Sequence, residues 1–130
     1  MFEKDMTVGV LLDFYGDVLP THTKSLLTMY YGEDLSLAEI AESEGISRQG
    51  VRAHIKRGVE DLRFLEEKLG LSAQFARMQK AASRLAVCAQ ALAGHPDGAV
   101  RALADEAMLC AETILSDQEE EEGQRVREFD

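Results

Sequence analysis

Residues 35–58, LSLAEIAESEGISRQGVRAHIKRG, predict two short helices joined by a tight turn. Ser36 and Glu39 have the spacing of a capping box, which marks the start of the first helix. Gly45 stands where the chain must reverse, since glycine reaches positive φ without steric cost. Ser47 is placed to cap the second helix. Five small or apolar residues share the spacing of a helix-turn-helix core: Ile40, Ala41, Ile46, Val51 and Ile55.

The rest of the composition predicts an all-α protein. The chain has 130 residues, 45% of them hydrophobic, which suffices for one globular domain or two small helical units. Cys88 and Cys110 fall inside apolar helical stretches, so we expect two reduced core thiols in a reducing compartment. The short apolar run at residues 8–12 is flanked by charges and predicts neither a signal peptide nor a membrane span. We therefore expect a cytoplasmic protein.

Three segments follow from the hydrophobic pattern. Residues 1–71 form a helix-turn-helix domain, whose second motif helix extends to about Leu69 and stops at Gly70. Residues 72–116 form an antiparallel helical hairpin around a break at residues 93–98. Residues 117–130 form an acidic, disordered tail. In the hairpin, the predicted seam consists of Phe75, Met78, Ala82, Leu85, Ala89 and Leu92 on one helix, and Val100, Leu103, Ala107, Cys110 and Ile114 on the other.

The alanine-rich hairpin buries little apolar area by itself. We therefore expect it to pack on the long helix before it or on a second copy of the chain, and we predict a homodimer.

The sequence offers no catalytic or metal site. The three histidines lack metal-ligand spacing with either cysteine, and there is no glycine-rich phosphate loop or recognisable nucleophile elbow. We predict a non-enzymatic protein without a cofactor.

The second motif helix is the candidate nucleic-acid site. Its first ten residues, 48–57, contain no acid. At about 100° per residue, Val51 and Ile55 define its buried side, and the polar residues project away from that side. Gln49 and Arg52 could then contact base edges in a major groove. The phosphate-binding candidates are Arg48, Lys56 and Arg57.

The charge of the chain gives mixed support for a nucleic-acid site on this helix. The net charge of −10 disfavours generic attraction to nucleic acid, but residues 97–130 alone hold 11 acidic and 3 basic residues. A solvated basic face, paired with Glu60 and Asp61 one turn later, explains the motif helix equally well.

A second basic surface is predicted on the first hairpin helix, where Arg77, Lys80 and Arg84 share a face. It is either a solubilising face or a docking surface for RNA or an acidic partner. The glutamate run at residues 119–122 could compete with nucleic acid for these basic faces.

The N-terminal half resembles a known family, the YlxM-type helix-turn-helix proteins of bacteria. The similarity covers residues 11–71 and rests on Leu12-Asp13-Phe14-Tyr15, Tyr30-Tyr31, Glu33-Asp34, Leu35-Ser36-Leu37, Glu39-Ile40-Ala41, Ser47-Arg48-Gln49 and Ile55-Lys56-Arg57. The same segment is more distantly similar to region 4 of sigma factors. The YlxM resemblance implies an all-helical protein with a role in the signal recognition particle pathway, and it implies the targeting GTPase, its RNA, or both as partners.

Three functions stay open at this point. The first is a regulatory or accessory protein of the signal recognition particle pathway. The second is a dimeric, sequence-specific DNA-binding transcription regulator. The third is a protein-interaction module whose motif has lost nucleic-acid binding.

Overall fold

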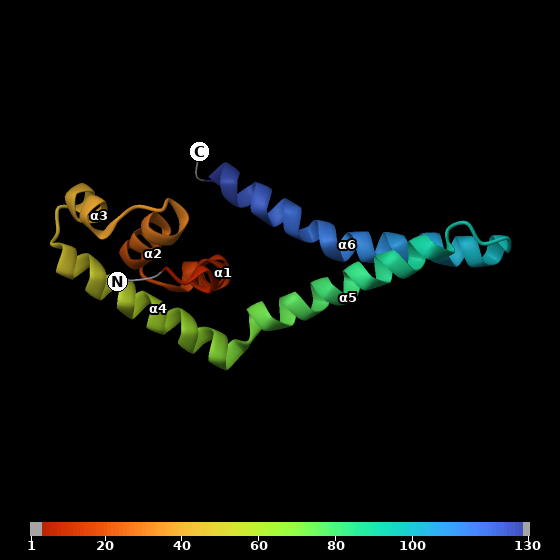
Figure 1. The fold of residues 1–130 in the computed structure, drawn as a ribbon, viewed down its shortest axis with the longest axis horizontal. Coiled ribbons are helices and arrows are strands. Elements are labelled where there is room, and N and C mark those ends of the chain that lie inside the picture. The colour runs from red at the N-terminus through yellow and green to blue at the C-terminus, as the bar shows by residue number, and fades with distance from the viewer. Residues whose placement is uncertain (1–3, 129–130) are drawn as a thin grey trace. The chain divides into compact units, whose positions relative to one another are not determined.

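The computed structural model describes the backbone of residues 4–128 and the side chains of residues 4–116. Every regular element in these residues is helical, which confirms the all-α prediction. The chain divides into two compact units, the first ending at Ser72 and the second beginning at Ala73 (Figure 1).

The first unit contains four α-helices. These are α1 (Met6–Tyr15), α2 (Thr21–Leu27), α3 (Leu37–Glu44) and α4 (Arg48–Leu69). A 3-10 turn (Gly16–Val18) follows α1, and one π-helical turn (Thr28–Gly32) follows α2. The core of the unit is formed where α1, α2 and α3 meet α4, and its fully buried side chains include Tyr15, Leu26, Leu27, Ile40, Val51, Ile55 and Leu62.

The predicted helix-turn-helix is confirmed as α3 and α4. Ser36 and Glu39 form the capping box, because the Glu39 N–H donates to Ser36 Oγ and the Ser36 N–H donates to Glu39 Oε1. Gly45 takes φ 69° in the turn. The Gly50 N–H donates to Ser47 Oγ at 2.9 Å, so Ser47 caps α4 as expected. The starts of α3 and α4 and the turn between them are therefore set by local residues.

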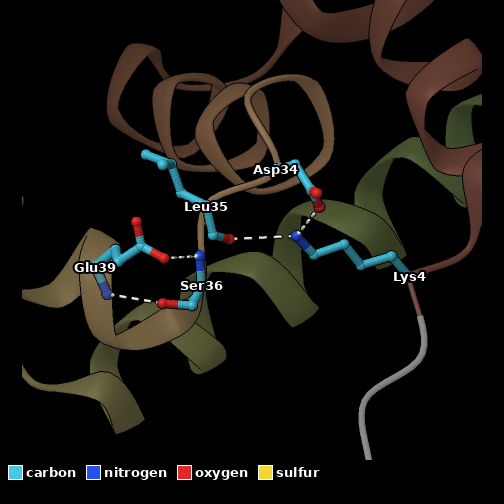
Figure 2. A network of polar contacts seen from close by, with 5 residues as sticks. All are labelled: Lys4, Asp34, Leu35, Ser36 and Glu39. Atoms are coloured by element: carbon cyan, nitrogen blue, oxygen red, sulfur yellow. Dashed lines mark hydrogen bonds and ion pairs between the residues drawn. The ribbon is translucent and has the colours of Figure 1, made fainter.

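The start of α3 is tied to the N-terminal segment by Lys4 (Figure 2). Lys4 Nζ donates to Asp34 Oδ1 at 2.7 Å and to the Leu35 carbonyl oxygen at 3.3 Å. The same ammonium lies 4.2 Å from the centre of the Tyr30 ring. Its hydrogen bond and its charge lower the pKa of the Asp34 carboxyl below the usual 3.8.

A buried tyrosine organises the end of the first unit. Tyr15 Oη donates to Glu66 Oε2 at 2.7 Å and accepts from the Leu71 N–H at 3.0 Å. The Ser72 N–H donates to the same Glu66 oxygen at 3.2 Å. Two N–H groups at the start of α5 are thereby satisfied from α1 and α4, where no intrahelical acceptor exists. Burial of the phenol raises the pKa of Tyr15.

The second unit is a helical hairpin formed by α5 (Leu71–Leu92), from Ala73 onward, and by α6 (Gly98–Glu128). The chain reverses between the two helices (Figure 1). Asp97 caps α6, because its Oδ1 accepts from the Ala99 N–H at 2.9 Å. The Arg101 guanidinium donates back to the carbonyl oxygens of His95 and Pro96, at 2.7 and 3.0 Å. The turn is thus closed by the first residues of α6.

The predicted seam of the hairpin is partly wrong. Among the hairpin side chains that the structure describes, the buried ones are all alanines, namely Ala82 and Ala89 on α5 and Ala104 and Ala111 on α6. Most of the larger apolar residues assigned to the seam are exposed instead: Met78, Leu85, Leu92, Leu103 and Ile114. Small residues occupy the contact because they let two helices approach closely, and a neighbouring row of larger residues is left outside.

One further expectation is corrected. Cys88 and Cys110 are free but exposed, so they are not core thiols. The backbone of α6 is helical as far as Glu128, and the acidic tail predicted for residues 117–130 begins within this helix. Glutamate is a good helix former, so the run at residues 119–122 does not oppose the helix. The side chains of this segment, and residues 129–130 altogether, lie outside the described residues.

Candidate nucleic-acid interface

Helix α4 has a buried side that fixes which residues can meet a ligand. Val51 and Ile55 are fully buried, and Gly58 continues this side along the helix. A Cβ on Gly58 would lie 2.7 Å from Leu27 Cδ1 and 2.8 Å from Thr23 Cγ2. The helix backbone therefore lies very close to α2, and glycine is the residue that allows it.

All five predicted nucleic-acid-binding residues lie on exposed positions of α4. They are Arg48, Gln49, Arg52, Lys56 and Arg57. The first three turns of the helix thus present an accessible basic surface, on the motif helix that enters the major groove in helix-turn-helix proteins.

A groove runs along one side of this basic surface. It is open to solvent, has a volume of about 630 Å³, and includes three of the predicted residues: Gln49, Arg52 and Lys56. Arg48 and Arg57 are not among its lining residues. The structure therefore separates the predicted site into a groove-lining set and two flanking arginines.

Arg63 and Tyr31 are among the groove residues that sequence reasoning missed. Arg63 follows Arg52 by eleven residues, or about three helical turns, so the helical period could have placed it on the same face. Tyr31 comes from the π-helical turn before α3, and no local pattern links it to α4. Burial raises the pKa of the Tyr31 phenol, which is partly covered in the groove wall.

The groove is not uniformly positive. Asp5 and Glu60 also line it, and Arg63 Nη2 lies 3.3 Å from Asp5 Oδ2 in an ion pair. Asp5 also caps α1, since its Oδ1 accepts from the N–H and the hydroxyl of Thr7, and these bonds lower the pKa of the Asp5 carboxyl. A polyanion at Arg63 would have to compete with this carboxylate.

The second basic surface lies on α5. Arg77, Lys80 and Arg84 are all exposed there. Lys80 and Arg84 border a shallow hollow of about 330 Å³ together with Ser83, Val87 and Cys88, and Arg77 lies outside it. The structure thus brings two of the three residues together.

Comparison with known proteins identifies the family. Residues 2–91 match the model of the UPF0122 family, described as "Putative helix-turn-helix protein, YlxM / p13 like". The chain belongs to this family. The match includes the helix-turn-helix and nearly all of α5, whereas α6 lies beyond it.

Individual relatives agree with this assignment. A UPF0122 protein of Listeria monocytogenes serotype 4b is 42% identical over 85 residues, which cover 65% of this chain and 77% of the relative. A UPF0122 protein of Acetivibrio thermocellus is 45% identical over 80 residues, covering 62% and 68% of the two chains. A third, from Desulforamulus reducens, is 42% identical over 73 residues, covering 56% and 62%.

In the part of the chain that the structure describes, no group of three His, Cys, Asp or Glu side chains could hold a metal ion. None of the described helices is long and apolar enough to cross a membrane.

Proposed function

We propose that this protein binds nucleic acid through the groove side of α4. The observation that carries the proposal is the exposure of Arg52 and Lys56 beside Gln49, on the first three turns of the second helix of a helix-turn-helix. Guanidinium and ammonium groups neutralise phosphates, and such contacts supply most of the affinity for nucleic acid. Arg48 and Arg57 extend this contact on either side of the groove.

The biological setting follows from the YlxM resemblance. We propose a regulatory or accessory role in the signal recognition particle pathway, with the targeting GTPase, its RNA, or both as partners. In this proposal the protein acts in the cytoplasm as a homodimer, without catalytic activity. A relation to region 4 of sigma factors is part of the same proposal.

A second candidate is a dimeric DNA-binding transcription regulator. It is favoured by the position of Gln49 and Arg52 in the first two turns of α4, where helix-turn-helix proteins contact base edges. Glutamine and arginine are the residues that bind adenine and guanine edges in the major groove.

The test is the double variant Arg52→Gln/Lys56→Gln, measured by fluorescence anisotropy with the RNA of the targeting particle and with a pool of duplex DNA. Lys68→Gln is the control, because Lys68 lies on the same helix but outside the groove, near the Phe64 ring. If both cations bind phosphates, the slope of log affinity against log salt falls by about 2 in the double variant and by none in the control.

The outcomes separate the candidates. An equal loss for RNA and all DNA sequences indicates backbone contacts, whereas a loss confined to one DNA sequence favours the transcription regulator. No loss on any nucleic acid contradicts the nucleic-acid proposal. A pull-down with the purified targeting GTPase, with and without its RNA, tests the pathway, and binding to neither would exclude this role.

A further inference from the structure

The second unit exposes a regular row of large apolar side chains. On α5, Met78, Leu85 and Leu92 are spaced seven residues apart, and they are 51%, 43% and 45% exposed. A seven-residue repeat of large apolar residues is the pattern of a helix face that packs along another helix. A surface helix that only had to meet solvent would not need it.

The buried alanines fix the register of the hairpin. Ala82 and Ala89 are seven residues apart on α5, and Ala104 and Ala111 are seven residues apart on α6. Ala89 and Ala104 are nearest to the turn, and Ala82 and Ala111 lie one heptad further from it on both helices. Two antiparallel helices that meet through these alanines therefore keep one register along the contact.

Five exposed apolar residues of the two helices lie on one face of this hairpin, whereas Val87 and Leu109, which are 70% and 64% exposed, lie away from it. At about 100° per residue, Met78, Leu85 and Leu92 are displaced from the buried alanines of α5 in one rotational sense. Leu103 and Ile114, together with exposed Cys110, are displaced from the alanines of α6 in the same sense. Because the helices are antiparallel, equal senses of rotation bring both rows to the same face.

The opposite face exposes polar residues. Ser83 and Gln90 on α5, and Asp105 and Glu112 on α6, are displaced from the alanines in the other rotational sense, and all four are exposed. The hairpin as a whole is therefore amphipathic, although its helices already meet each other through the alanines.

The two edges of the apolar face carry opposite charges. Arg77 and Arg84 border it on the α5 side, where residues 72–96 contain no acid. Glu106 borders it on the α6 side. A second copy rotated about an axis parallel to the helices places its α6 over α5, so that its acidic edge meets the basic edge. Stacking α5 on the α5 of the second copy would instead bring arginines together.

We propose that this face, formed by Met78, Leu85, Leu92, Leu103 and Ile114, is the surface on which a second copy of the chain docks. The α5 of one copy packs antiparallel on the α6 of the other, which closes a four-helix bundle. The inference rests on the homodimer of the proposed function and names its interface. It does not depend on nucleic-acid binding.

The first experiment measures the mass of the full chain by analytical ultracentrifugation over a concentration series. The wild type sediments at twice its 14.4 kDa mass. Leu85→Gln and Leu103→Gln each raise the dimer dissociation constant at least tenfold. Leu109→Gln is the matched control, because Leu109 is 64% exposed on α6 but lies away from this face, and it leaves the constant unchanged.

The second experiment tests the pairing of the edges. Arg84→Glu and Glu106→Arg each weaken the dimer, and the double variant Arg84→Glu/Glu106→Arg restores it. Within one chain the two residues lie on opposite edges of the hairpin, so rescue reports a contact between copies. Circular dichroism shows that every variant keeps its helical content.

Each contrary result removes a different part of the inference. A wild type that stays monomeric at 100 times the protein concentration of the binding assays overturns both the interface and the homodimer, while the RNA and DNA titrations still judge the nucleic-acid proposal. A dimer insensitive to Leu85→Gln and Leu103→Gln overturns the interface alone. If the leucine variants weaken the dimer but the double variant Arg84→Glu/Glu106→Arg does not restore it, the packing of α5 on the second copy's α6 is overturned.

Discussion

Replacing Gly58 by alanine tests the close approach of α4 to α2. In an open helical position this change would stabilise the protein, because alanine has the better helix propensity by about 1 kcal/mol. At Gly58 the added Cβ would lie 2.7 Å from Leu27 Cδ1 and 2.8 Å from Thr23 Cγ2, well inside the ordinary contact distance of about 3.5–4.0 Å. Leu27 is fully buried, so its side chain cannot give way without disturbing the core packing around it.

The magnitude follows from a comparison with Gly9. Gly9 is a glycine of α1, and a Cβ built on it meets no atom within 4 Å. Gly9→Ala is therefore expected to stabilise by about 0.5–1 kcal/mol. Gly58→Ala gains the same propensity but adds an overpacking cost of about 1–3 kcal/mol. The difference in unfolding free energy between the two variants isolates the overpacking cost. Relative to the wild type, we expect Gly58→Ala to be destabilised by about 1 kcal/mol.

The assay is thermal or urea unfolding followed by tyrosine fluorescence. All three tyrosines lie in the first unit and the chain has no tryptophan, so the signal reports this unit alone. A difference of 1 kcal/mol corresponds to a shift of about 4–8 °C in Tm for a unit of this size. In a Thr23→Ser background, which removes one of the two clashing methyl groups, the cost of Gly58→Ala is smaller. If Gly58→Ala were as stabilising as Gly9→Ala, the packing argument would be refuted.

Two further predictions concern polar contacts of the same unit. Tyr15→Phe removes the hydroxyl that joins Glu66 to the start of α5, and we expect a loss of about 1.5–2 kcal/mol in urea unfolding, since one of the lost bonds is to a carboxylate; an unchanged midpoint would contradict this. Asp34→Asn keeps a residue that tolerates the φ of 56° but removes the charge held by Lys4. Because the pKa of Asp34 is lowered in the folded state, its contribution is full above the unfolded value of 3.8 and is lost as the pH falls through the folded value. The stability difference between wild type and variant is therefore present at pH 7 and disappears in acid, and a difference that persists at pH 2 would refute the ion-pair argument.

The helix-turn-helix could be predicted from sequence because its signals are local. The capping box of Ser36 and Glu39 and the left-handed Gly45 each act within a few residues, and the structure confirms them. The groove could be predicted only in part. Arg52 and Lys56 lie on one helix face, but Tyr31 reaches the same groove through tertiary packing that no sequence period encodes.

The hairpin shows a different limit of sequence reasoning. Its apolar residues form two adjacent rows on each helix, and a period of three and four residues fits either row. The sequence prediction placed larger residues such as Leu85 and Leu103 in the contact beside the alanines. The structure gives the contact to Ala82 and Ala104, because small side chains allow the closer approach. A period identifies which residues share a face, but it does not decide which of two neighbouring rows meets the partner helix.

The groove on α4 and the proposed dimer face on the hairpin lie in different units of an acidic chain. The basic groove is formed by residues of the first unit, and the proposed dimer face by residues of the second. A chain with a net charge of −10 gains little general attraction to a polyanion, so two cations such as Arg52 and Lys56 provide only weak binding by themselves. Joining two copies through the hairpin doubles the number of such grooves without adding a base contact, and the second groove binds at the high effective concentration set by the first. In the proposed dimer, nucleic-acid affinity depends on the hairpin, so we expect substitutions at Leu85 to weaken nucleic-acid binding although that residue lies outside the groove.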